Sequence, residues 1–412
     1  MNENILETIE IVLADLAKKY TPPGTLHKAV IHQWLHAISE GNLLFALNRG
    51  VSSNEVLNLL RQSESISKNK IKDIVHSLIN IKPKKQTFTF IDLFAGIGGM
   101  RIGFQNVGGS CVFSSEFDKY SQQTYFENHG EFPFGDITII NEKDIPDHDV
   151  LVAGFPCQPF SHAGLKLGID DTRGTLFYDM ARIPKEKQPK FALLENVKGL
   201  ISHDKGHTLK IILKQLSSIG YKCIIDKDEI NKDSDAVLKR KAKNMVLKSK
   251  DYGVPQNRQR IYMVFWRDDM DGFYYPDALN LSTKVGDILE LNPLKKYTIS
   301  DKLWTGHKRR KKENKKAGKG FGYGIVSNTS EYTNTISARY YKDGSEILIR
   351  QNGQNPRKIT PREAARLQGF PENFILNTSD VQAYKQFGNS VSVPVIEAIA
   401  KNIKKQLELS NA

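Results

Sequence analysis

One cysteine lies where its surroundings favour reaction over packing. Cys157 is set between two prolines, directly after an apolar run at 149–153. Such a loop can present a thiol rigidly to a cleft, where nearby cations would lower its pKa toward the nucleophilic thiolate. Cys111 and Cys223 lack this context and are expected to be small buried apolar groups. The three cysteines contain no C-x-x-C pair, which makes a cysteine zinc site or a disulfide framework a poor interpretation.

A carboxylate and two arginines border two further apolar runs. Glu195 follows the run at 191–194, and partial removal from water would let its carboxyl exchange a proton near neutral pH. Arg258 and Arg260 precede the run at 261–265, and two residues apart on a strand they would face one site together. The ordinary alternatives are a strand-end salt bridge and structural ion pairs. Combined with the thiol, these groups predict a reactive centre.

A glycine loop supplies a third element of this chemistry. The run Phe94-Ala-Gly-Ile-Gly-Gly follows an apolar segment, and backbone N–H groups in such a loop can approach a ligand closely. No Lys-Ser or Lys-Thr follows, so this is no P-loop, and Arg101 stands where G-x-G-x-x-G needs its third glycine. Glu116, 20 residues after Gly96, can bind a ribose hydroxyl pair, and Asp136 can accept from an adenine amino group. The loop and these acids predict a nucleoside-containing cofactor.

The elements that must position these groups alternate between strands and helices. Apolar runs predict strands at 87–93, 110–114, 149–153, 191–194 and 261–265. Helical periodicity lies between them at 121–126, 176–183 and 208–216. This alternation predicts an α/β fold with a doubly wound parallel sheet. Such sheets bind ligands at the carboxyl ends of their strands, which is where the candidate reactive residues lie.

The chain on either side of this region has a different composition. Residues 1–86 show helical periodicity, with Ser52 and Ser67 as expected N-caps. A helix-turn-helix is one interpretation of this part, and a small helical accessory domain is the favoured one. The segment 302–319 holds nine Lys or Arg residues against one acid. Glycines and aromatics follow it, which predicts a smaller, mostly β domain with a nucleic-acid surface.

The overall composition is that of a globular protein with a basic excess. Hydrophobic residues make up 39% and charged residues 25% of the 412 residues, which excludes a disordered chain. The net charge of +13 favours a polyanionic partner, with solubility alone as the alternative. No apolar run reaches the length of a membrane span, and the acidic start lacks a signal peptide's basic region. We expect a soluble, cytoplasmic protein.

In their order along the chain, these residues resemble the motifs of the DNA (cytosine-5)-methyltransferases of bacterial restriction-modification systems. The resemblance runs from about residue 90 to the C-terminus and leaves 1–86 outside as a helical extension. Its motifs are Asp92-Leu-Phe-Ala-Gly-Ile-Gly-Gly, Pro156-Cys-Gln, Asp171-Thr-Arg-Gly-Thr-Leu, Glu195-Asn-Val, Gln256-Asn-Arg-Gln-Arg, the run from Arg357 to Arg366, and Gln386-Phe-Gly-Asn-Ser-Val. The family implies a catalytic and cofactor-binding domain at 87–275, completed by 376–412, and a target-recognition domain at 276–375.

The resemblance also implies roles for individual positions. Residues that would hold S-adenosylmethionine are Phe94, Gly96, Gly98, Glu116, Phe117, Asp136, Ile137, Asn389 and Ser390. The Cys157 thiolate would add to C6 of a flipped-out cytosine and so make C5 nucleophilic enough to take the methyl group. Glu195 would protonate or hydrogen-bond N3, and Arg258 and Arg260 would hold the base. No metal is implied.

The implied partner is double-stranded DNA carrying a short specific sequence. Contacts to it are expected from Gln158, Arg339, Tyr340 and Lys342. The stretches at 320–324 and 337–344 partly resemble the recognition region of Dcm-like enzymes that methylate CCWGG. The family setting implies a monomer that is the modification half of a restriction-modification system, with a restriction endonuclease acting separately.

Three other functions share part of this pattern. A nicotinamide-dependent oxidoreductase would also use the glycine loop and Glu116, but it needs the third glycine and has no use for Pro-Cys-Gln. A DNA-binding regulator descended from the family becomes attractive only if Cys157 or Glu195 is lost, and both are present. The third is an RNA-directed methyltransferase with the same motifs. A methyl-transfer assay that compares duplex DNA with tRNA distinguishes it from a DNA methyltransferase.

Overall fold

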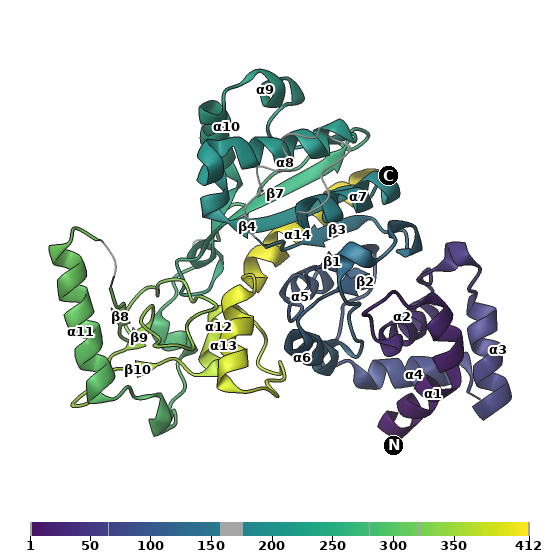
Figure 1. Cartoon of the computed structure of the whole chain (residues 1–412), viewed down its shortest axis with the longest axis horizontal. Helices are drawn as coiled ribbons and strands as arrows, with labels where there is room; N and C mark the ends of the chain where they lie inside the picture. The colour runs from purple at the N-terminus through teal and green to yellow at the C-terminus, as the bar shows by residue number, and fades with distance from the viewer. Residues whose placement is uncertain (1, 65, 157–175, 280, 320–321, 411–412) are drawn as a thin grey trace. The chain divides into compact units, whose positions relative to one another are not determined.

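A computed structural model describes residues 2–64, 66–156, 176–279, 281–319 and 322–410. The chain divides into two compact units that interleave along the sequence (Figure 1). The first, called the sheet unit, contains Met1–Val246, Arg260–Tyr275 and Ile399–Ala412. The second unit contains Leu247–Gln259 and Pro276–Ala398. Within the described ranges, no helix is long and apolar enough to cross a membrane.

Four helices form the N-terminal part of the sheet unit, as the helical periodicity predicts. They are α1 (Asn2–Tyr20), α2 (His27–Glu40), α3 (Ser53–Glu64) and α4 (Lys68–Leu78). Ser52 Oγ accepts from Glu55 N at 3.1 Å and caps α3, and Ser67 Oγ accepts from Lys70 N at 3.2 Å and caps α4. Such caps satisfy backbone N–H groups that the first helical turn leaves unpaired. Both expected N-caps are therefore confirmed.

The sheet unit is built on a mostly parallel sheet. Its strands are β1 (Phe88–Leu93), β2 (Gly109–Ser115), β3 (Val150–Ala153), β4 (Phe191–Val197), β5 (Tyr221–Lys222), β6 (Val246–Lys248) and β7 (Gln259–Arg267). Their order is β2-β1-β3-β4-β7-β5, with β6 paired to β7. Strands β2, β1, β3 and β4 run parallel, whereas β7 runs antiparallel to β4. The central strands are buried almost throughout, which explains why their sequences are nearly continuous apolar runs.

Helices alternate with these strands as the sequence predicts. They are α5 (Gly99–Gln105), α6 (Lys119–His129), α7 (Leu176–Lys187), α8 (His207–Ser218), α9 (Lys227–Lys232), α10 (Asp235–Lys241) and α14 (Val393–Ser410). Each predicted strand and helix of this region is present, with ends that differ by a few residues. The doubly wound α/β fold is thus confirmed.

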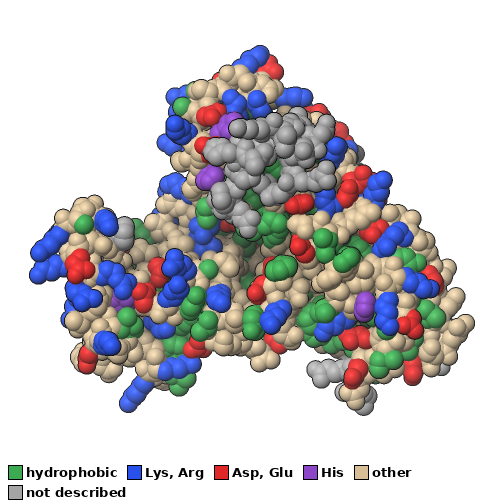
Figure 2. Space-filling view, in the orientation of Figure 1, with side chains coloured by type: hydrophobic (Ala, Val, Ile, Leu, Met, Phe, Trp, Pro, Cys, Tyr) green, Lys and Arg blue, Asp and Glu red, His purple; other side chains and the backbone are tan. Residues whose placement is uncertain are grey.

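Among its described residues, the second unit carries the separate small sheet, three complete helices and the first turns of α14. Two-residue strands β8 (Ile325–Val326), β9 (Leu348–Ile349) and β10 (Arg357–Lys358) pair in the order β10-β9-β8. The helices are α11 (Asp301–Lys316), α12 (Pro361–Leu367) and α13 (Asp380–Asn389). Most of the basic run at 302–319 is therefore helical, where its surroundings predicted mainly strands, because Lys and Arg are good helix formers and Ser300 caps α11. Figure 2 shows Lys and Arg side chains gathered over this helix.

Candidate functional site

Those predicted site residues of the sheet unit that the structure describes lie at one edge of its sheet. Strand β2 leads into Glu116, β1 into the loop at 94–98 and β3 into Gly154, while Glu195 lies near the end of β4. These strands are parallel, so their carboxyl ends share an edge. Because β7 is antiparallel to β4, its first residues, including Arg260, lie at that edge too. The strand order thus places a glycine loop beside a carboxylate and an arginine.

The loop after β1 has a conformation that depends on glycine. Gly96 and Gly98 have φ angles of +57° and +83°, and Phe94 has +56°. A bulky side chain is rarely held at positive φ unless its surroundings constrain it. An added Cβ at Gly98 would lie 2.1 Å from His129 Nε2, whereas one at Gly96 would meet nothing within 4 Å. Gly98 therefore packs the loop onto the protein, and Gly96 leaves an open cradle.

Glu116 adjoins this cradle from the neighbouring strand. Its Oε2 accepts from Gly96 N at 2.7 Å, and its Oε1 accepts from Asp118 N at 2.7 Å. Burial raises the pKa of this carboxyl, and the two backbone hydrogen bonds oppose that shift. The next side chain, Phe117, is 80% exposed, so its ring is accessible for stacking. A carboxylate beside an accessible ring suits a ribose with a purine base.

A further segment lies beside β2 and carries Asp136. Phe134 pairs with Ser115 in a parallel bridge, and Phe134 O accepts from Glu116 N at 2.8 Å. Asp136 Oδ1 accepts from Thr138 N at 2.9 Å. The residues that this edge brings together are Phe94, Gly96, Gly98, Glu116, Phe117, Asp136 and the buried Ile137. The open glycine cradle and its acids fit an adenosine-containing cofactor.

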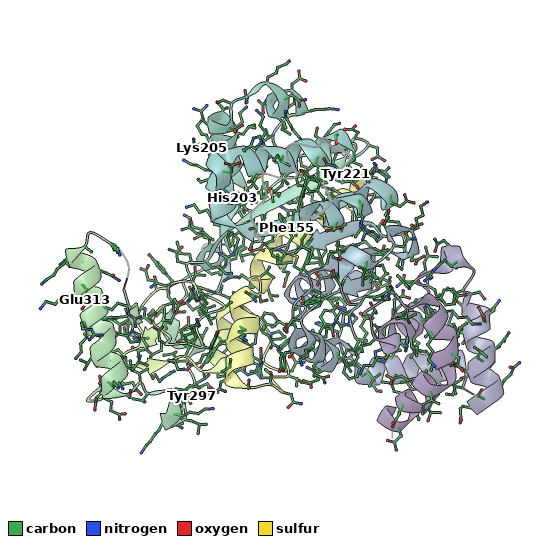
Figure 3. All side chains as sticks on the ribbon, in the orientation of Figure 1. Phe155, His203, Lys205, Tyr221, Tyr297 and Glu313 are labelled. Carbon is green, nitrogen blue, oxygen red and sulfur yellow. The ribbon has the colours of Figure 1, made fainter. Side chains whose placement is uncertain are left out.

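Glu195 and Arg260 form an ion pair at this edge. Arg260 Nε lies 3.2 Å from Glu195 Oε1, and both side chains are largely buried. An added Cβ at Gly154 would lie 3.7 Å from Glu195 Oε2, and Asn196 Nδ2 donates to Phe155 O at 2.9 Å. The carboxylate therefore lies beside the chain that leaves β3, where Figure 3 labels Phe155. A guanidinium in this position orients the carboxylate.

The predicted nucleophile Cys157 and its neighbour Gln158 lie outside the described residues, which end in this segment at Pro156. Cys111 and Cys223 are buried, as expected, and burial raises the pKa of each thiol to about 12. Neither thiol can ionise near neutral pH. Across the described ranges, no group of three or more His, Cys, Asp or Glu residues could hold a metal ion.

Arg258 holds segments of the second unit together through hydrogen bonds. This corrects the expectation that it faces a site together with Arg260. It precedes β7 and is 2% exposed. Its guanidinium donates to the carbonyl oxygens of Ile336, Gly388 and Ser390 at 3.1, 3.1 and 2.6 Å. The strand periodicity failed here because the strand begins only after Arg258, so the alternation of faces does not extend to it.

The other predicted residues of the second unit differ in accessibility. Asn389 ends α13 and is exposed, and Ser390 follows it half-buried. Arg339 and Lys342 are exposed, as a DNA-contacting side chain must be. The roles of these four residues stay predictions.

Tyr340 is a core residue, which corrects its assignment as a DNA contact. Its side chain is fully buried. The hydroxyl donates to Ile347 O at 2.6 Å and accepts from Ile359 N at 2.9 Å. Its ring packs edge-on against Tyr384 with centroids 5.0 Å apart. A tyrosine held in this way cannot reach a base edge.

A buried charge network behind the glycine loop was missed from the sequence. Arg101 of α5 forms an ion pair with Glu131, and its Nη1 donates to Tyr125 OH at 2.9 Å. On β1, burial raises the pKa of Asp92 to about 8, and the charge of Arg101 opposes that shift. The signal was a pair of opposite charges, Asp92 and Arg101, on either side of the apolar glycine motif. The network fixes α5 and with it the loop that precedes this helix.

Comparisons with known proteins agree on one family. Residues 88–405 match the family model of the C-5 cytosine-specific DNA methylases. The chain is 59% identical over 324 residues to Type II methyltransferase M.NlaX of Neisseria lactamica, covering 78% of this chain and 97% of that protein. It is 41% identical over 345 residues to Type II methyltransferase M.HhaI of Haemophilus parahaemolyticus, covering 80% and 98%. The crystal structure of S. pombe Dnmt2 methyltransferase has the same fold, with a TM-score of 0.60 and 20% identity over 79% of this chain and 100% of that one.

Proposed function

This chain belongs to the C-5 cytosine-specific DNA methylase family, and we propose that it methylates a flipped-out cytosine within a short specific sequence of duplex DNA. As a member of that family it is a DNA cytosine-5-methyltransferase and uses S-adenosylmethionine. One observation carries the proposed residue roles: the Glu195–Arg260 pair lies at the same sheet edge as the cradle of Gly96 and Glu116. The reaction needs a group that acts on the base close to groups that hold the cofactor.

The proposed mechanism answers a chemical difficulty at the base. Cytosine C5 is a weak nucleophile because the ring electrons are delocalised. The Cys157 thiolate adds to C6, an S–C6 bond forms, and N3 takes a proton from the Glu195 carboxyl, which leaves C5 enamine-like. Once C5 carries the methyl group, it loses its proton to water, the S–C6 bond breaks and the thiolate is regenerated. N3 then returns its proton to Glu195.

The contacts of Glu195 support this role. Its carboxylate is largely removed from water, which is the setting in which a carboxyl can exchange protons near neutral pH. Arg260, 3.2 Å away, orients the carboxylate and stabilises negative charge that develops beside it. Asn196 holds the neighbouring chain through Phe155 O. Glu195 therefore acts on the base, and Arg260 supports it.

The cofactor supplies an electrophilic methyl group when it is bound. Glu116 would accept hydrogen bonds from the ribose hydroxyls, Phe117 would stack on the adenine, and Asp136 would accept from the adenine amino group. Gly96 leaves room for the ligand because it has no side chain. Asn389 and Ser390 remain predicted cofactor contacts.

Several partner interactions complete the proposal. A base stacked in a duplex cannot be reached by such a site, so the cytosine is flipped out of the helix. Arg339, Lys342 and Gln158 are proposed DNA contacts, with target recognition in 276–375. The Type II names of the relatives support a role as the modification half of a restriction-modification system. The enzyme would act as a monomer, and its cognate endonuclease would act separately.

A covalent trap tests the central step. DNA made by PCR with 5-fluorocytosine in place of cytosine is expected to form an adduct with the wild-type protein and cofactor, because fluorine cannot leave C5 as a proton does. The Cys157→Ala variant is expected to lose this adduct and about a thousandfold of its methyl transfer, because the nucleophile is absent. Denaturing gels and transfer of a tritiated methyl group are the measurements.

The matched control removes a buried thiol. Cys223→Ala deletes a sulfur that is held in the core, so both adduct and methyl transfer are expected to persist. Methyl transfer by Cys157→Ala at the wild-type rate would contradict the covalent mechanism. Preference for tRNA over duplex DNA in the same assay would contradict the substrate.

A further inference from the structure

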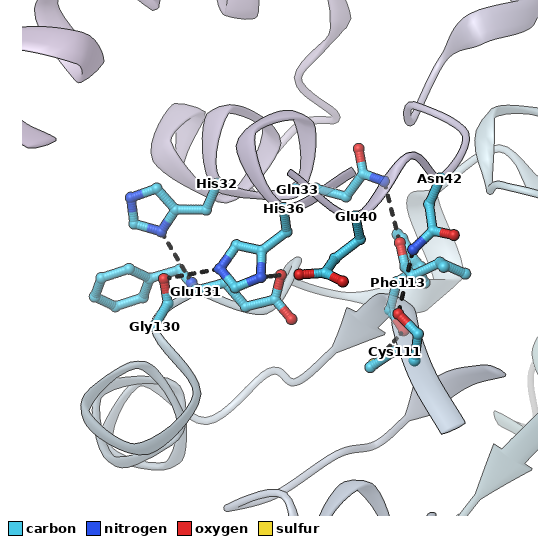
Figure 4. Close-up of polar contacts among 12 residues, drawn as sticks. His32, Gln33, His36, Glu40, Asn42, Cys111, Phe113, Gly130 and Glu131 are labelled. Carbon is cyan, nitrogen blue, oxygen red and sulfur yellow. Dashed lines mark hydrogen bonds and ion pairs between the residues drawn. The ribbon is translucent and has the colours of Figure 1, made fainter. Parts of the chain in front are cut away.

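Residues 21–49, called the N-terminal layer, pack against the segment that carries Asp136. That segment, residues 130–144, lies between α6 and β3 in the chain and is called the adenine segment. Helix α2 supplies much of the contact, and ten of its fourteen residues are buried. His32 Nδ1 accepts from Phe132 N at 3.1 Å. His36 Nε2 lies 3.2 Å from Gly130 O, and Figure 4 shows both of these residues. The layer thus holds the start of the adenine segment.

A second contact is aromatic and lies two residues before Asp136. The Phe45 ring packs on Phe134 with centroids 4.5 Å apart, and on Phe113 of β2 at 6.0 Å. Phe45 is itself fixed, because its N–H donates to Gln33 Oε1 at 2.7 Å. The amide of Gln33 also donates to Val112 O at 3.1 Å. These contacts join the layer to β2 and to the adenine segment at once.

A third contact is made by Gly135, the residue next to Asp136 in the sequence. Gly135 N donates to Thr25 Oγ1 at 3.3 Å. An added Cβ at Gly135 would lie 3.0 Å from Gly24 O, so the two backbones approach as closely as a glycine allows. Thr25 is 9% exposed and Gly135 is buried, so water cannot replace the threonine hydroxyl as an acceptor.

The layer also holds the far end of the adenine segment. Ala46 N donates to Asp144 O at 2.8 Å, and Arg49 Nε lies 3.1 Å from Asp144 Oδ2. Contacts therefore lie on both sides of Asp136 along the chain. A surface extension that merely covered apolar residues would not need paired polar contacts at both ends of one loop.

We propose that the N-terminal layer contributes to cofactor binding. In it, Thr25 is a positioning residue that fixes the position of Asp136 through its hydrogen bond with Gly135. The inference rests on the proposed function, since it takes Asp136 as the adenine contact. It assigns residues 21–49, which lie outside the matched family model, to cofactor affinity. A DNA-contacting role and a purely structural role are the competing assignments.

The test uses the full chain with Thr25→Val, which removes the hydroxyl and keeps the shape. Loss of one neutral hydrogen bond to the loop is expected to weaken binding of S-adenosylhomocysteine about fivefold by isothermal titration calorimetry without DNA. The KM for S-adenosylmethionine should rise by a similar factor. The kcat at saturating cofactor and the KM for DNA should stay within about twofold of wild type. Thr25→Ser is expected to restore the affinity.

The matched control removes another capping hydroxyl from the N-terminal helices. Ser52→Ala deletes the cap of α3, whose hydroxyl accepts from Glu55 N, and its cofactor affinity is expected to equal that of wild type. Equal loss in both variants, or a lowered Tm of Thr25→Val with unchanged affinity, would overturn the proposal in favour of a structural role. A raised KM for DNA alone would overturn it in favour of DNA contact. If the wild-type protein forms no adduct on 5-fluorocytosine DNA, the proposed mechanism fails separately, because the calorimetry needs no turnover.

Discussion

Asp92 is a carboxyl that the fold keeps out of water. Its side chain is 1% exposed on β1, and burial raises its pKa to about 8 despite the opposing charge of Arg101. The acid is therefore protonated at neutral pH. A neutral carboxyl at this position, two residues before Phe94, avoids the cost of an unpaired buried charge beside the glycine loop.

The raised pKa of Asp92 determines the direction in which protein stability changes with pH. Unfolded chains ionise this carboxyl above 3.8, whereas the folded protein keeps the proton up to about 8. Unfolding therefore releases a proton in that window, and the free energy of unfolding falls as pH rises, by about 1.4 kcal/mol per pH unit from this group. The Asp92→Asn variant has no proton to release. Its free energy of unfolding minus that of wild type is therefore expected to increase by about 1.4 kcal/mol per pH unit between about pH 5 and about pH 7.

Urea unfolding at several pH values measures this difference. Asp73→Asn is the matched control, since Asp73 is exposed on α4 and its replacement should leave the slope unchanged. Parallel stability curves for wild type and Asp92→Asn would show that Asp92 is ionised in the folded protein.

Strands and helix ends were predictable from the sequence where a single local sequence signal determines them. The strands from β1 to β4 follow from apolar runs because both faces of a central parallel strand are buried. The caps Ser52 and Ser67 follow because a hydroxyl at a helix start has one local partner. The helix α11 was not predictable in this way, since a charged, glycine-flanked run does not distinguish a solvated helix from loops between short strands.

The exposed lysines of α11 allow a test of whether this helix binds DNA. Lys312 and Lys316 are exposed and one turn apart on this helix, so both can face a phosphate backbone. Replacing both with Gln is expected to make the slope of log K against log salt less negative by about 1.8 if each neutralises one phosphate. The kcat should stay near wild type. DNA binding measured by fluorescence anisotropy at several salt concentrations gives the slope.

A control with the same change of charge lies on another helix. Lys68 and Lys72 are exposed and one turn apart on α4, and their replacement with Gln should leave the slope as in wild type. Equal slopes for the α11 variant and wild type would remove this helix from the DNA-binding surface.

At the scale of the whole molecule, the sequence predicts candidate site residues more fully than the contacts that hold them. Motif order and strand ends point to the glycine loop, Glu116 and Glu195 as candidates. The hydrogen bonds of Arg258 to Gly388 and of Gln33 to Val112 join residues 130 and 79 positions apart. No local pattern encodes such partners, so burial of Tyr340 and docking of the N-terminal layer appear only in the folded chain.

Expression in a methylation-free host tests the molecule as a unit. Bisulfite sequencing of a plasmid from that host is expected to show one short sequence with its cytosine fully protected from conversion, because a modification enzyme must mark every copy of its site. A plasmid carrying the Cys157→Ala gene is the control and should convert completely. Protection spread over unrelated cytosines would contradict sequence-specific methylation.

The reversed direction of β7 has a consequence for how this chain can vary. Glu195 stands near the end of one strand and Arg260 near the start of its antiparallel neighbour, so the pair is set by strand register and not by the length of chain between them. Within the chain between them, the helices α8, α9 and α10 can change in length without changing the register of β4 and β7. The chain must nevertheless enter β7 in the same pairing register, since a slip of a single residue would turn the guanidinium to the opposite face of the sheet.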